Sequence, residues 1–135
     1  MPPDLTWFHE TLLAAEPRSA ALARDFVDLH LDQHELPHLV EVVRLVVSEL
    51  ATNAVAHAQT PFVVTLSRSN GSVLLVIQDG SISVPVRSAP DFMDVSGRGM
   101  TIVESLCQEW GIRTDGLGYK AVWASFPSDG RSARR

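Results

Sequence analysis

The hydrophobic and polar positions in the first half of the chain predict two helices. The first is expected over 19–30, after Pro17, because proline is tolerated in the first turn of a helix. Its large apolar residues at helical spacing are Leu22, Phe26 and Leu29. The second and longer helix is expected over 37–57. Its apolar positions form a wide stripe, which is typical of a helix packed heavily along one side: Leu39, Val42, Val43, Val46, Val47, Leu50, Ala54 and Val55.

Short extended segments elsewhere predict the strands of a sheet. Asn70-Gly71 separates two of them, and this pair favours the two-residue turn of a β-hairpin. The expected strands, the first of them an edge strand, cover 6–13, 62–68, 73–78, 110–114 and 120–126. Because helices and strands are segregated along the chain, the pattern predicts an α/β (α+β) two-layer sandwich. In this fold, one mixed, mostly antiparallel sheet has its helices on one face.

Residues 79–96 have no periodic pattern and are rich in glycine, serine and proline. A loop of this length inside a compact domain is uncommon, and such loops are usually lids or binding loops. A further helix is expected after Gly97-Arg98-Gly99. Its apolar residues are Met100, Ile102, Val103 and Leu106.

The composition indicates one folded domain of ordinary polarity. Of 135 residues, 45% are hydrophobic and 20% charged; we expect a domain over 1–127 and a flexible basic tail over 128–135. The net charge of −5 argues against a non-specific nucleic-acid binder, which is usually basic. The single cysteine, Cys107, excludes an intrachain disulfide and suits a reducing compartment. Without a signal-peptide pattern or an apolar run of about 18 residues, the expected location is the cytoplasm, with no membrane contact.

Three polar residues of the second helix can act together. Glu49, Asn53 and His57 are four residues apart and therefore lie along one face of the helix. The Asn53 side-chain oxygen is a hard ligand that Mg²⁺ accepts beside water and phosphate. The Glu49 carboxylate can take a proton from a hydroxyl group or from water. Spacing alone favours a more ordinary alternative, a solvated polar face, because polar residues at this spacing are common.

Two further sites flank the long loop. Asp79 ends an apolar strand just before Gly80 and is well placed to meet a ligand; the alternative is a simple Asp-Gly turn. Gly97 and Gly99 precede a helix, where a backbone without side chains can approach a phosphate, and Arg98 adds a positive charge. The alternative for this segment is a flexible hinge. The sequence has no Walker A pattern, so P-loop and Rossmann sites are disfavoured.

Together and in this order, these segments resemble the GHKL (histidine kinase-like) ATPase family. Residues 49–54, Glu-Leu-Ala-Thr-Asn-Ala, resemble its asparagine box, Asp79-Gly80 the start of its first glycine box, and Gly97-Arg98-Gly99-Met100 the second. Residues 118–123 occupy the place of the closing strand. The resemblance covers about residues 5–126 and implies a Bergerat-type ATP-binding fold. Within the family the chain looks like the stand-alone anti-sigma-factor serine kinases, because histidine kinases carry an added helix pair and gyrase-type members are far longer.

The resemblance implies a role for each residue. Asn53 would hold Mg²⁺, which bridges the phosphates of ATP, and Glu49 would be the general base on a serine hydroxyl of a partner protein. Asp79 would accept a hydrogen bond from the adenine amino group. The segment 80–96 would form a lid over ATP, and the backbone N–H groups of Gly97 and Gly99 would contact phosphate. The remaining members of the implied ATP-binding set are Gly80, Arg98 and Met100.

The implied function is phosphorylation of an anti-sigma-factor antagonist protein at serine, together with binding of a sigma factor. Two departures from the family pattern support an alternative, a degenerate module that captures a protein with weak or no ATP binding and no kinase activity. Residues 79–83 read Asp-Gly-Ser-Ile-Ser where the family has Asp-x-Gly-x-Gly, and Ala121 stands where the closing strand often has threonine. A third interpretation is an unrelated α/β domain in which these residues are structural. A homodimer is a further hypothesis, based on the apolar residues Trp7 and Phe8.

Overall fold

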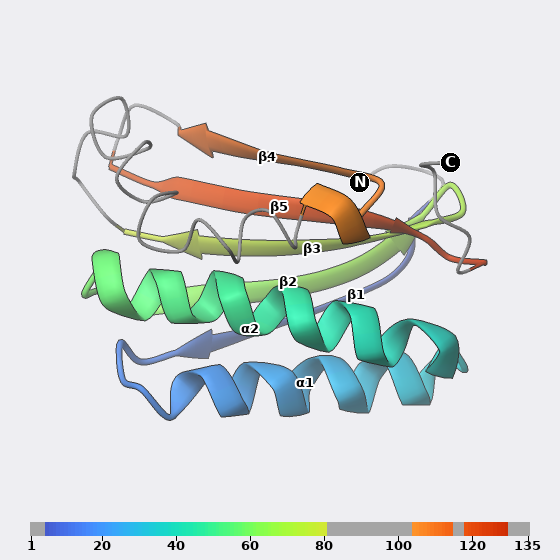
Figure 1. Cartoon of the computed structure of the whole chain (residues 1–135), viewed down its shortest axis with the longest axis horizontal. Coiled ribbons are helices and arrows are strands. Elements are labelled where there is room, and N and C mark those ends of the chain that lie inside the picture. Colours follow the sequence, from blue (N-terminus) through green and yellow to red (C-terminus); the bar gives the residue numbers. More distant parts are fainter. Residues whose placement is uncertain (1–4, 81–103, 115–117, 130–135) are drawn as a thin grey trace.

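A computed structural model describes residues 5–80, 104–114 and 118–129 of the chain. A five-stranded sheet forms one layer, and two α-helices pack on one of its faces (Figure 1). The strands lie in the order β1-β2-β3-β5-β4, and all four described pairings are antiparallel. The predicted two-layer sandwich is confirmed, with an antiparallel rather than a mixed sheet in the described part. The elements are β1 (Leu5–Leu13), α1 (Ser19–Gln33), the 3₁₀ turn η1 (Pro37–Leu39), α2 (Val40–His57), β2 (Phe62–Ser69), β3 (Ser72–Asp79), β4 (Glu109–Thr114) and β5 (Lys120–Pro127).

The turn between β2 and β3 has the conformation that its sequence predicts. Asn70 and Gly71 have φ angles of 52° and 76°, in the left-handed region that asparagine and glycine tolerate best. Ser69 pairs with Ser72 directly across the turn. This two-residue loop matches the twist of the flanking strands, so it fixes the register in which β2 and β3 pair.

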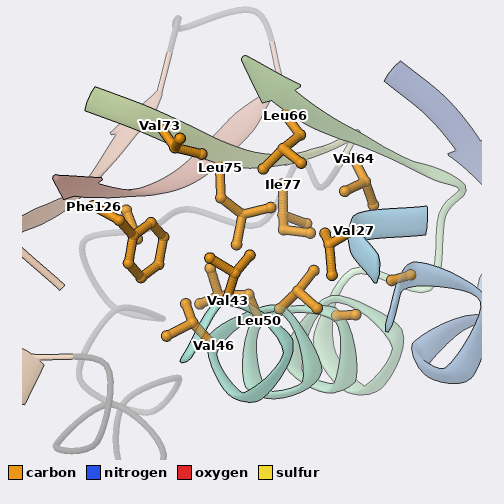
Figure 2. Close-up of a cluster of buried hydrophobic side chains, with 14 of the residues drawn as sticks. Val27, Val43, Val46, Leu50, Val64, Leu66, Val73, Leu75, Ile77 and Phe126 are labelled. Carbon is orange, nitrogen blue, oxygen red and sulfur yellow. The ribbon is translucent and has the colours of Figure 1, made fainter. Parts of the chain in front are cut away.

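Alternate residues of β2, β3 and β5 point toward the helices and form the sheet side of the core. They meet Val27 of α1 and Val43, Val46 and Leu50 of α2 (Figure 2). All of these side chains are at most 2% exposed. This packing holds α2 against the sheet and thereby sets the position of its polar residues. The strand residues are Val64, Leu66, Val73, Leu75, Ile77 and Phe126.

The first helix packs through a different face from the one that its largest apolar residues suggest. Ala23, Val27 and Leu31 are completely buried, whereas Leu22 and Leu29 are 42% and 62% exposed. Apolar residues occur almost all round this helix, so periodicity alone does not select the buried face. The small side chains of Ala23 and Val27 let α1 approach its neighbours closely, because the distance between packed helices depends on the side chains at the contact.

The first strand is an edge strand, as predicted, since it pairs only with β2. Its side chains alternate between half-buried and exposed positions. Trp7 packs against the core on the half-buried side, whereas Phe8 and Leu12 are 50% and 68% exposed on the opposite side. The two residues of the homodimer hypothesis therefore face opposite sides of the sheet, and a partner on the face opposite the described helices would meet Phe8 and Leu12.

A close contact on the side of the sheet opposite the described helices gives a test of the packing. Trp123 of β5 pairs with Gly111 of β4, and a Cβ atom added to Gly111 would lie 2.9 Å from the indole. We expect Gly111→Ala to lower the free energy of unfolding by about 1–3 kcal/mol, the usual cost of overpacking. Chemical denaturation measures this loss. In a Trp123→Ala background the same substitution should cost much less, and an equal cost in both backgrounds would show that the indole is not the obstacle.

Candidate nucleotide-binding site

The candidate site begins on the C-terminal half of α2. The buried face of this helix includes one polar residue. Asn53 is only 2% exposed and lies among the buried residues Leu50, Ala51 and Ala54. Glu49, one turn earlier, and His57, the last residue of the helix, are half-buried. A buried carboxamide requires polar partners to offset its loss of water. The solvated polar face considered as an alternative is therefore wrong for Asn53.

The end of β3 supplies the second part of the site. Asp79 is 3% exposed and occupies the last position of the strand, where it pairs with Phe62 on one side and Lys120 on the other. It faces the helix side of the sheet, because its partner Phe62 is a fully buried core residue. A carboxylate in this position is not an ordinary exposed turn residue, so the simple Asp-Gly turn does not account for Asp79.

Lys120 is a buried charged residue beside Asp79 that sequence reasoning did not single out. It begins β5 directly opposite Asp79 and is 7% exposed. Burying an ammonium group is costly unless an opposite charge or hydrogen bonds compensate, and a buried carboxylate lies at the paired position of the next strand. The sequence signal that could have found Lys120 is the alternation along β5. Lys120 has the same parity as Val122, Ala124 and Phe126, and so is a cation on the apolar face of its strand.

A hydrogen bond joins the end of β3 to the connection that follows α2. The backbone N–H of Gly80 donates to Thr60 Oγ1 over 3.1 Å. Thr60 comes three residues after the end of α2 and just before β2. This bond holds the Asp79-Gly80 peptide close to the C-terminal end of the helix. A Cβ atom at Gly80 would meet Thr60 no closer than 3.7 Å, so the described surroundings leave room for one.

The ends of three secondary-structure elements lie together in this part of the molecule. The C-terminal end of α2, the end of β3 and the start of β5 lie at the same end of the sheet (Figure 1). The structure thus brings Asn53, Asp79 and the missed residue Lys120 to one end of the fold. Gly97, Arg98, Gly99 and Met100, together with the expected lid over 81–96, lie outside the described residues. The described end of the helix expected after Gly99 is helical at residues 104–106.

Ala121 lies on the other side of the sheet. It pairs with Gln78 and Arg113 and lines a depression together with them on the face opposite the described helices. Asp79 and Lys120, one position earlier on each strand, face the helices. The predicted departure from threonine at Ala121 therefore concerns the face opposite the described helices and not the face that carries Asp79.

Comparison with known proteins identifies the family. The model of the histidine kinase-like ATPase domain matches residues 13–126, well over half of the chain. The chain belongs to this family. The match includes every residue of the predicted site, and it makes this chain a histidine kinase-like ATP-binding domain. No curated protein matches the chain. Neither described helix is long and apolar enough to cross a membrane.

The described residues fit the ligands that this family implies. No group of three or more histidine, cysteine, aspartate or glutamate side chains among them is arranged to hold a metal ion. A Mg²⁺ ion in a nucleotide site needs no such cage, because phosphates and water supply most of its ligands beside one or two protein oxygens. The Asn53 amide oxygen is a donor of this kind.

Proposed function

We propose that this protein is a cytoplasmic ATP-dependent serine kinase of the anti-sigma-factor type, which phosphorylates an antagonist protein and binds a sigma factor. One observation carries the proposal. Asn53 is buried on the helix face that also bears Glu49, at the end of the sheet where Asp79 and Lys120 are buried. This arrangement supports the proposal, because it would bring a metal ligand, a base and the Asp79–Lys120 strand pair to one end of the fold.

Each residue has a distinct part in the proposed reaction. Asn53 would hold the Mg²⁺ ion, which neutralises phosphate charge, and Asp79 would accept a hydrogen bond from the adenine amino group. The serine hydroxyl of the partner attacks the γ-phosphorus of ATP, the bond to the β-phosphate oxygen breaks, and ADP leaves. Glu49 accepts the hydroxyl proton as the new oxygen–phosphorus bond forms. Positioning and charge neutralisation supply most of the catalysis in phosphoryl transfer, which suits a site of few residues.

Binding of Mg-ATP is the first test of this proposal. We expect Asn53→Ala to weaken Mg-ATP binding at least about tenfold, since even residues that only orient metal ligands are worth 10–100-fold. Isothermal titration calorimetry on the wild type and the variant measures the change. Thr52→Ala is the matched control, because Thr52 is the preceding residue of α2 and is exposed; its affinity should equal that of the wild type. Unchanged affinity in a folded Asn53→Ala protein would remove Asn53 from the site.

A second candidate function is the degenerate module that captures a protein without nucleotide. The changed glycine box, Asp-Gly-Ser-Ile-Ser at 79–83, favours it. The same calorimetry distinguishes the two functions. If the folded wild-type protein binds no Mg-ATP, the module becomes the better account, whereas saturable binding that weakens in Asn53→Ala argues against it.

A further inference from the structure

A cluster of three histidines lies between the edge strand and the first helix, away from the nucleotide site. His9 comes from the half-buried side of β1, and His30 and His34 come from the end of α1. His9 stacks on His30 with ring centroids 3.8 Å apart and planes at 12°. Trp7 of β1 stacks on His34 at 4.1 Å and 4°. These two stacked pairs, which we call the histidine cluster, join β1 to α1.

A direct bond between two imidazoles links the pairs. His9 Nε2 and His34 Nε2 are 2.8 Å apart, a hydrogen-bond distance. Such a bond needs a proton on one nitrogen and a lone pair on the other. When both rings are charged, both nitrogens carry protons, and the bond is replaced by repulsion between two like charges. The contact therefore exists only while at least one of these rings is neutral.

The surroundings of the cluster also disfavour positive charge. Burial lowers the pKa of His9, and the neighbouring His30 and His34 lower it further. Burial likewise lowers the pKa of His34, with additional effects from His30 and from Arg68 of β2. His30 itself contacts the uncharged amide of Gln33 through Nδ1. The charged groups that lower these two pKa values are thus the histidines of the cluster and, for His34, Arg68.

No nearby carboxylate offsets this effect in the part of the chain that the structure describes. The ion pairs Arg18–Glu16 and Arg44–Asp28 do not involve the cluster. Asp32 and Glu35, which flank His34 in sequence, are exposed. Protonation of the cluster would consequently gather positive charges without an acidic partner.

We propose that His9, His30 and His34 form a proton-sensitive latch, which holds the edge strand β1 on α1 at neutral pH and releases it in mild acid. The sign follows from the contacts. While β1 is docked on α1, the pKa values of His9 and His34 lie below the ordinary histidine value of 6.5. As the pH falls, the state with β1 released therefore takes up protons first. The stabilisation is complete above about pH 6.5 and is lost as the pH falls below it.

The released state has a predictable place in the fold. β1 is the edge of the sheet, held by β2 on one side and by its contacts with α1 beneath. Loss of the latch therefore leaves β1 held mainly by its pairing with β2, and so easier to open, while β2, β3 and β5 keep their pairings and their packing on α2. Acid would open this edge locally before it unfolds the domain, and the inference does not depend on nucleotide binding.

Hydrogen exchange of the backbone amides of the full chain tests the latch. After correction for intrinsic rates, protection of β1 should fall between pH 7.5 and 5.5, while protection of β3 and β5 is maintained. The protection of β1 can fall by about tenfold for each histidine that is neutral when docked and titrates normally when released, because pH 5.5 is about one unit below the ordinary histidine pKa. His34→Gln retains a hydrogen-bonding group without titrating, so β1 should lose much of its pH response.

Controls separate the latch from general acid unfolding. His38→Gln removes an exposed histidine of η1 outside the cluster and should leave the pH response of β1 as in the wild type. Equal loss of protection in β1, β3 and β5, or a full response in His34→Gln, would overturn the proposal. If His34→Gln does not fold, the NMR titration of the wild-type imidazole C–H signals decides. His9 and His34 titrating at 6.5 would contradict a latch, and lower midpoints that coincide with β1 opening would support it.

Discussion

Glu49→Gln is expected to lower the rate of serine phosphorylation by about 10²–10⁴-fold, the usual contribution of a positioned general base. Mg-ATP affinity should change little, because the amide has the shape of the carboxylate and the proposed metal ligand, Asn53, is kept. The wild-type protein would first be incubated with γ-labelled ATP and a soluble extract of the source organism to find a labelled protein. Phosphoamino-acid analysis of that protein would establish phosphoserine. Initial rates on that protein would then be compared between wild type and variant.

A matched substitution on the same helix controls this experiment. Glu41 is an exposed residue in the first turn of α2, far from the C-terminal half that carries the site. Glu41→Gln makes the same chemical change and should phosphorylate at the wild-type rate. Transfer at the wild-type rate by Glu49→Gln would exclude Glu49 as the base. Loss of both transfer and ATP affinity in this variant would instead indicate that its carboxylate is needed to bind the nucleotide.

The sheet could be predicted well because its signals are local. Asn70-Gly71 specifies a hairpin by backbone conformation alone, and alternation along 120–126 identifies β5 and its buried side. The packing of α1 could not be predicted in this way. Its apolar residues lie on several sides, so the choice of Ala23, Val27 and Leu31 as the buried face depends on the shapes of the sheet and α2. That information is tertiary and is absent from the helix's own periodicity.

The candidate site likewise has one part that local sequence predicts and another that depends on the pairing of distant strands. Glu49 and Asn53 are close in sequence, and one helical turn suffices to bring them together. Lys120 lies opposite Asp79 only because β3 pairs with β5. Forty residues of chain separate the two positions in the sequence. Alternation along β5 puts Lys120 on the buried face, but no residue near it in the sequence identifies Asp79 as the carboxylate opposite it. The roles of Gly97, Arg98, Gly99 and Met100 stay predictions from the family resemblance.

A pair of leucines on α1 tests the face through which this helix packs. Leu31 is completely buried, and Leu29, two residues earlier, is 62% exposed. We expect Leu31→Ala to lower the free energy of unfolding by about 2–5 kcal/mol, because a buried leucine loses its transfer energy and leaves a cavity behind. A loss of this size is a large fraction of the total stability of a small domain, typically about 5–15 kcal/mol. Urea denaturation followed by circular dichroism measures it.

Leu29→Ala provides the comparison, since it removes the same atoms from the same helix. An exposed site away from any special contact usually changes stability by no more than about 0.5 kcal/mol, and alanine has a slightly higher helix propensity than leucine. The difference between the two variants therefore isolates burial from helix propensity. If Leu29→Ala were the more destabilising, α1 would pack through the face of Leu22, Phe26 and Leu29, and His30 and His34 would then be displaced from β1. The same pair of variants thus tests the helix orientation on which the histidine cluster depends.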